Sequence, residues 1–191
     1  MKSVLISIQP KWCALIASGE KTVEVRKTRP KLDLPFKCYI YCTKGKGDCL
    51  WRWNGIWYDT QDPTHRPNRM DGKVVGEFVC DAIFPISCYY SNTAARGIHR
   101  DQPYTCLTDK EMIDYLGNGV EGCGWHISNL VIYDKPLDVS EFWKPDKCPW
   151  VSTKGCTYEY HCFRAGQTKR CGDTLSRPPQ SWCYVERRDI V

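Results

Sequence analysis

The residues with the clearest chemical potential lie in one stretch, SGEKTVEVRKTRP, at residues 18–30. Lys21, Glu24 and Arg26 fall within six residues of one another, shortly after Gly19. A lysine beside an acid can form an acid–base pair, and neighbouring cations lower a lysine pKa so that it can act as a base. The same cations can instead bind phosphate, with arginine making bidentate contacts. A third interpretation is that Glu24 and Arg26 only pair with each other.

Further candidate ligand-binding residues lie close to this stretch or in a later strand-like segment. Gln9 and Lys11 follow the first predicted strand, and Arg29 comes just after the basic turn. Trp125 and Ser128, in the segment GWHIS, offer a stacking ring and a hydroxyl group. The alternative for these two is a core tryptophan and an ordinary strand serine.

The elements around residues 18–30 can be predicted from local patterns. Alternating apolar residues predict a strand over 4–8, and Pro10 is typical of the first turn of a helix. Gly19 favours the end of that helix, and alternation over 22–26 predicts a second strand. The sequence therefore predicts a strand, a short helix, a turn and a strand, with polar groups converging at the turn.

The rest of the chain is rich in strand-like segments. Strands are predicted over 36–43, 73–83 and 122–133, and Gly76 indicates a bulge or a close backbone approach. The pair Asn54 and Gly55 predicts a type I′ hairpin that opposes the residues of 51–53 to those of 56–58. Its aromatic face can stack on bases or pack on the protein, and we favour packing. Thr108 and Glu111 predict a capping box for a short helix that ends at residue 116.

Positive charge is concentrated in the first quarter of the chain. Of the net charge of +5, residues 1–46 contribute ten Lys or Arg against three acids, whereas the remainder has seventeen against nineteen. This asymmetry favours a polyanionic partner over an ordinary solvated surface. The 191 residues fit one domain, and no apolar run reaches the length of a membrane span or of a signal peptide. We therefore expect a cytoplasmic protein with no membrane partner.

Eight of the thirteen cysteines fall into two groups. Four of them, Cys38, Cys42, Cys80 and Cys88, lie in apolar strand-like segments, where packing in the core is the better interpretation. Four others lie in a polar tail that has little apolar material of its own: Cys148, Cys156, Cys162 and Cys171. A structural zinc ion would supply folding energy to this tail, although no Cys-x-x-Cys pair is present. The alternative is a loop with free or buried thiols.

Three segments in order resemble the ASCH domain family of the PUA-like superfamily. They are SIQPKWCALIASGEKTVEVRKTRP, KVVGEFVCDAI and GWHISNLVIYDKPLDVSEF, and the family pattern Gly-x-Lys-x-x-Glu-x-Arg is intact as Gly19, Lys21, Glu24 and Arg26. The ending RPPQSWCYVE resembles the ends of longer phage and Firmicutes-type members. The resemblance implies an α+β, mainly β fold: a PUA-like β pseudo-barrel with short helices and a Cys-rich C-terminal extension. We predict the domain over residues 1–143, with insertions near 45–71 and 88–106, and the extension over 144–191, ending in a strand that returns to the barrel.

The resemblance also implies a cleft beside the turn that carries the family pattern, called the signature turn below. This cleft would accept RNA, single-stranded nucleic acid or a nucleotide-like ligand. An alternative is a hydrolase, a ribonuclease or a nucleoside amidohydrolase, that uses Lys21 with a carboxylate, either Glu24 or Glu77. The amidohydrolase branch of the family has threonine as its nucleophile where this chain has Glu24, so that mechanism does not transfer. A third alternative is a protein-interaction or regulatory module built on the insertions and the tail. We favour binding.

Overall fold

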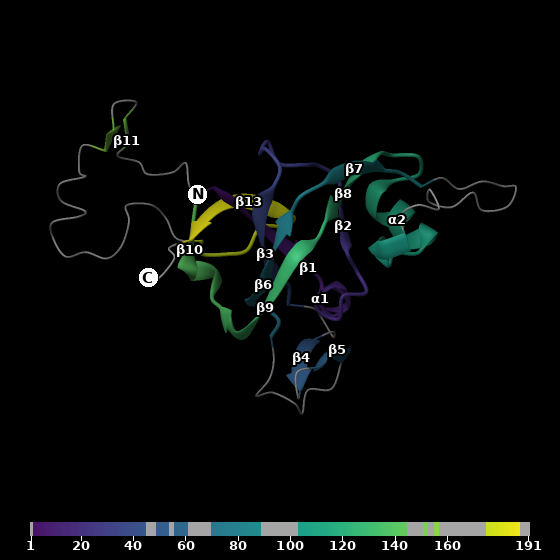
Figure 1. The fold of residues 1–191 in the computed structure, drawn as a ribbon, viewed down its shortest axis with the longest axis horizontal. Helices are drawn as coiled ribbons and strands as arrows, with labels where there is room; N and C mark the ends of the chain where they lie inside the picture. The colour runs from purple at the N-terminus through teal and green to yellow at the C-terminus, as the bar shows by residue number, and fades with distance from the viewer. Residues whose placement is uncertain are drawn as a thin grey trace, which may run out of the picture.

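The computed structural model describes residues 2–44, 70–88, 103–144 and 175–187, together with the backbone of four short strands outside these ranges. Two sheets carry the described part of the chain. A six-stranded mixed sheet has the order β10-β13-β1-β3-β6-β9, and a three-stranded sheet has the order β2-β8-β7. With two short helices α1 and α2, this is the predicted α+β, mainly β fold (Figure 1).

The larger sheet is built on β1 (Ser3–Ile8), in which every residue is buried. It pairs in parallel with β3 (Phe36–Cys42) and antiparallel with β13 (Trp182–Arg187), which itself pairs with β10 (Phe142–Trp143). On the other side, β3 pairs with β6 (Val74–Cys80), and β6 pairs with β9 (Ser128–Leu137). The segment WCYVER therefore returns to the larger sheet, between β1 and the edge strand β10. The division of the chain at residue 143 stays a prediction.

The smaller sheet contains β2 (Val23–Arg26), β8 (Gly122–His126) and β7 (Ile83–Ile86), all antiparallel to their neighbours. Helix α2 (Asp109–Leu116) packs on it through a buried cluster that includes Val23, Val25 and Met112. The predicted capping box is confirmed, because the Thr108 side chain accepts from the Glu111 backbone N–H and the Glu111 carboxylate accepts from the Thr108 N–H. The same glutamate thereby fixes where α2 begins.

Each of two long predicted strands is divided into two shorter strands in the structure. The strand predicted over 73–83 breaks at residues 81–82, where β6 of the larger sheet ends and β7 of the smaller sheet begins. The strand predicted over 122–133 breaks at Ile127, between β8 and β9. The chain thus passes from one sheet to the other at both places, and His126 N–H donates to the Ala82 carbonyl, 3.0 Å away, where the two breaks meet. Alternation alone does not reveal such a change of sheet, because both halves keep an apolar face.

The main core lies between the two sheets and helix α1 (Pro10–Ala17). It combines residues of β1, β3 and β6 with Ile16 of α1 and Trp125 of β8. Cysteines 38, 42, 80 and 88 are buried, as predicted. Burial raises the pKa of the thiols of Cys38 and Cys80, which fits their role as small apolar residues.

The predicted hairpin forms strands β4 (Cys49–Trp53) and β5 (Ile56–Thr60). Its register opposes Trp51 to Tyr58, Arg52 to Trp57 and Trp53 to Ile56, as the Asn-Gly turn predicts. The hairpin lies next to α1 (Figure 1). Whether its aromatic side chains pack or stack stays a prediction, since those side chains lie outside the described part of the structure.

Gly76 is expected to tolerate no side chain. A Cβ at this position of β6 would lie 2.5 Å from the Val131 carbonyl oxygen and 3.0 Å from the Ile132 side chain on β9. We expect Gly76→Ala to lower the free energy of unfolding by about 1–3 kcal/mol, measured by urea denaturation. Gly19→Ala is the comparison, because it adds a Cβ in open space at a φ of +82° and should cost about 1 kcal/mol. An unchanged midpoint for Gly76→Ala would contradict the close approach of β9.

Candidate functional site

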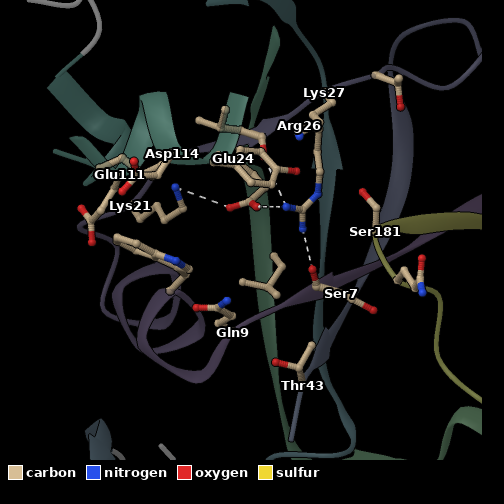
Figure 2. A pocket seen from close by; sticks show the side chains of 17 residues that line it. Ser7, Gln9, Lys21, Glu24, Arg26, Lys27, Thr43, Glu111, Asp114 and Ser181 are labelled. Carbon is tan, nitrogen blue, oxygen red and sulfur yellow. Dashed lines mark hydrogen bonds and ion pairs between the residues drawn. The ribbon is translucent and has the colours of Figure 1, made fainter. Parts of the chain in front are cut away.

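The signature turn is positioned by α1 and by the start of β2. The Gly19 N–H donates to the Ile16 carbonyl at 3.0 Å, and the positive φ of Gly19 ends the helix. Two residues later, the Lys21 N–H donates back to the Leu15 carbonyl at 2.9 Å. These bonds turn the chain sharply, so that Lys21 points inward, toward Glu24 on β2 (Figure 2).

Lys21 is buried, with 1% of its side chain exposed. Its Nζ donates to the Val23 carbonyl at 2.8 Å and to the Thr105 carbonyl at 2.5 Å, and it lies 3.5 Å from Glu24 Oε2. Burial lowers the pKa of Lys21, while the charge of Glu24 opposes that change. The prediction of a lowered lysine pKa is confirmed in direction, but its main cause is removal from water, with Arg26 a minor contributor.

Glu24 is held between two cations (Figure 2). Its Oε1 lies 2.8 Å from Arg26 Nη1, and Arg26 Nη2 donates to the Ser7 carbonyl of β1 at 2.6 Å. The arginine therefore ties β2 of the smaller sheet to β1 of the larger one. Two buried polar atoms of this pair, Glu24 Oε2 and Arg26 Nε, make no hydrogen bond in the described structure.

A cavity of about 760 Å³ opens beside this buried trio of Lys21, Glu24 and Arg26. Its walls come from the end of β1, from α1, β2 and α2, and from the segment before β13: they include Gln9, Trp12, Lys27, Thr28, Thr43, Glu111, Asp114, Tyr115, Gln180 and Ser181. The volume falls within the range of small-molecule sites, about 300–1,000 Å³. Because the lining mixes rings, amides, hydroxyls and both signs of charge, it can accept a polar ligand that also has an apolar surface.

Four of the predicted site residues line the cavity together: Gln9, Lys21, Glu24 and Arg26. Lys11 does not line it, but its Nζ lies 2.9 Å from the Oε1 of Glu111, which does. The Thr108 backbone N–H and Lys11 lower the pKa of Glu111 to about 2.

The other predicted site residues lie outside the cavity. Arg29 is exposed beyond the end of β2. Glu77, on β6, binds Lys37 at 2.8 Å and accepts from the Tyr133 hydroxyl at 2.6 Å, so the structure does not bring it to Lys21. Ser128 Oγ donates to the Val79 carbonyl at 2.9 Å.

Trp125 has no exposed surface and forms part of the main core. Its ring centroid lies 5.9 Å from that of Phe36 and 6.0 Å from that of Trp182. In the register of β2 and β8 it stands directly opposite Glu24. It therefore supports the strand that carries the buried trio and does not line the cavity.

Sequence reasoning missed several cavity residues. Trp12 lies in α1, six residues before Ser18, and this closeness to the signature turn is a usable signal. Glu111 and Tyr115 lie on α2, some 90 residues along the chain from the turn, and only the packing of α2 on β2 brings them near. Gln180 and Ser181 lie at the cavity because the Ser7 N–H donates to the Ser181 carbonyl at 2.8 Å. No local sequence pattern predicts this long-range hydrogen bond.

The predicted zinc ligands Cys148, Cys156, Cys162 and Cys171 lie outside the residues whose side chains are described, so this site stays a prediction. Within the described ranges, no three His, Cys, Asp or Glu side chains gather as metal ligands would. In those same ranges no helix is long and apolar enough to span a membrane.

Comparison with solved structures identifies the fold. The chain superposes on the crystal structure of ASCH from Zymomonas mobilis with a TM-score of 0.52 and 18% identity, covering 96% of this chain and 87% of that one. A point mutant of the same protein gives a TM-score of 0.52 and 19% identity, over 97% and 91% of the two chains. No family model and no curated protein matches the sequence. The ASCH fold that the three sequence segments predicted is thus confirmed.

Proposed function

We propose that this chain, which has the ASCH fold, is a member of that family that binds a nucleotide or a nucleotide unit of RNA in the cavity beside Lys21, Glu24 and Arg26. The observation that carries the proposal is the cavity itself. It is about 760 Å³ in volume and is lined by Lys21, Glu24 and Arg26 of the family pattern together with the rings of Trp12 and Tyr115. Aromatic rings and cations are the groups on which single-stranded nucleic acids and nucleotides are commonly held.

The charges of the cavity indicate which cation would meet a phosphate. Lys21 and Arg26 are already engaged with Glu24 and with backbone carbonyls. Lys27, by contrast, is exposed, lines the cavity and makes no ion pair with a carboxylate among the described residues. Its Nζ lies 5.5 Å from the centroid of the Tyr115 ring. A phosphate is therefore best accommodated at Lys27, beside that ring.

The test is a binding titration with nucleoside 5′-monophosphates and short single-stranded RNA over a series of salt concentrations. Lys27→Ala is expected to weaken RNA binding several-fold. It should also reduce the slope of the logarithm of the binding constant against the logarithm of the salt concentration by about 0.7, the contribution of one phosphate contact in a single strand. The matched control is Lys31→Ala, which removes the same charge from an exposed position outside the cavity. Equal losses in both variants, or no binding by the wild type, would contradict the proposal.

The hydrolase alternative is favoured by one observation, the buried Lys21 with a lowered pKa close to a carboxylate. Against it, Nζ of a charged Lys21 already donates to two carbonyls and forms an ion pair with Glu24 at 3.5 Å, so its charged form is well accommodated. The carboxylate partner would be Glu24, since Glu77 is held by Lys37 and Tyr133. Incubation of the wild type with RNA and with acylated nucleosides, followed by mass spectrometry, separates turnover from binding.

A further inference from the structure

We infer that the base of the bound nucleotide occupies the inner end of the cavity and places an N–H donor against Glu24 Oε2, with its phosphate at Lys27. This inference rests on the proposed function and specifies which part of the ligand the buried trio recognises. Glu24 is only 4% exposed and lines the cavity, yet its Oε2, which is ion-paired with Lys21 Nζ at 3.5 Å, accepts no hydrogen bond in the described structure. Burying a carboxylate oxygen that accepts no hydrogen bond costs free energy. A ligand that donates a hydrogen bond to this oxygen removes much of that cost, which strengthens its binding.

The same position excludes a phosphate. A phosphate oxygen accepts hydrogen bonds and carries negative charge, so it would repel the Glu24 carboxylate. Lys21 is not available to a phosphate, because its Nζ donates to the carbonyls of Val23 and Thr105 and is paired with Glu24 at 3.5 Å. The inner end of the cavity therefore suits a neutral group with an N–H donor, which the Watson–Crick edge of every common base provides.

The two aromatic residues of the cavity agree with this orientation. The Trp12 ring centroid lies 5.4 Å from Lys21 Nζ, which is itself 3.5 Å from Glu24 Oε2, so one ring lies beside the buried trio. The other, Tyr115, lies near Lys27. A base that stacks on Trp12 can point its polar edge toward Glu24, while the phosphate of the same nucleotide lies on the Tyr115 and Lys27 side.

Methylated nucleotides test the hydrogen bond directly on the wild-type protein. For the base that binds best, the probe is the 5′-monophosphate whose base N–H groups are replaced by N-methyl groups: N3-methyl for uracil, N4,N4-dimethyl for cytosine, N6,N6-dimethyl for adenine, and methylation at N1 and twice at N2 for guanine. The matched control carries its methyl group on carbon, at C5 of a pyrimidine or C8 of a purine, and keeps every donor. We expect N-methylation to weaken binding about 10- to 100-fold, as for a hydrogen bond to a charged group, and C-methylation to have a much smaller effect.

Glu24→Gln is the complementary variant. Arg26 Nη1 requires an acceptor at 2.8 Å, so the glutamine oxygen takes that side and the amide NH₂ replaces Oε2. The preference for the N–H probe over the N-methyl probe is then expected to fall to about one. Glu111→Gln is the control, because Glu111 lines the same cavity but its oxygens already accept from Lys11 and Thr108. This variant should keep the preference of the wild type.

The outcomes separate the two proposals. If all parent nucleotides bind but N-methylated and parent forms bind equally well to the wild type, the inference about Glu24 is wrong and the nucleotide site stands. If Glu24→Gln keeps the melting temperature of the wild type and still prefers the parent nucleotide to its N-methylated form, the base N–H donates to another residue of the cavity. The inference is then also wrong. If no parent nucleotide and no RNA binds, the proposed function itself fails.

Discussion

Replacing Lys21 by methionine is expected to lower the free energy of unfolding by about 3–5 kcal/mol, the cost of breaking a buried ion pair from one side. Methionine approaches the length of the lysine side chain but supplies neither charge nor donors. The carbonyls of Val23 and Thr105 would lose their partner, and Glu24 would keep only Arg26. The measurement is equilibrium unfolding in urea, followed by fluorescence and by circular dichroism.

The same substitution at an exposed ion pair gives the control. Lys11 pairs with Glu111 at 2.9 Å, but both side chains are substantially exposed, so Lys11→Met should cost less than about 1 kcal/mol. Both variants remove one cation near the cavity. If Lys21→Met and Lys11→Met lowered the free energy of unfolding equally, Lys21 would contribute no more than an exposed lysine, and the prediction would be wrong.

A double-mutant cycle separates the Lys21–Glu24 interaction from the loss of the carbonyl contacts. Glu24→Gln alone removes the negative charge while keeping the shape of the side chain. In the double variant Lys21→Met with Glu24→Gln, no carboxylate is left without its lysine. We expect the double variant to be more stable than the sum of the single losses predicts, by about 1–3 kcal/mol. Strict additivity would show that the 3.5 Å approach of Lys21 to Glu24 contributes nothing.

Local chemistry explains which parts of the fold the sequence could predict. Pro10, Gly19 and the Thr108–Glu111 box each act within one turn of a helix, and all three helix boundaries that they predict are found. The hairpin register follows from the two turn residues at positions 54 and 55. At the signature turn, Lys21, Glu24 and Arg26 converge because strand alternation puts Glu24 and Arg26 on one face and the helix end turns Lys21 onto it.

Long-range packing explains what the sequence could not predict. The sequence offered Glu77 as a carboxylate partner for Lys21. In the structure its strand belongs to the larger sheet, where Lys37 and Tyr133 are its hydrogen-bond partners. The cavity itself depends on α2 and on the segment before β13, which reach the turn through the Val23–Met112 cluster and the Ser7–Ser181 hydrogen bond. None of these contacts has a counterpart in local spacing.

Trp125 shows most sharply how a core residue differs from a ligand-binding one. Its side chain has no exposed surface, contacts Phe36 and Trp182, and stands opposite Glu24. We expect Trp125→Ala to lower the free energy of unfolding by about 3–5 kcal/mol, through lost burial and the space left behind. The measurement is urea denaturation monitored by circular dichroism, since the substitution also alters the fluorescence.

Trp125→Phe is the conservative variant that separates packing from binding. Its smaller ring leaves part of the space empty, but it also removes the buried indole N–H, which has no hydrogen-bond acceptor among the described residues. The two effects oppose each other, so the expected loss is below about 1.5 kcal/mol. Nucleotide affinity should stay within about twofold of the wild type, whereas Trp12→Ala, on the cavity wall, should weaken it about tenfold or more.

The reverse pattern would overturn the assignment of Trp125 to the core. If Trp125→Phe unfolds at the wild-type urea concentration but loses nucleotide affinity tenfold, its ring contacts the ligand. If Trp12→Ala then binds normally, the base stacks on the face of β8 and not on α1. Because Trp125 is fully enclosed and Trp12 lines the cavity, we expect stability to depend on Trp125 and affinity on Trp12.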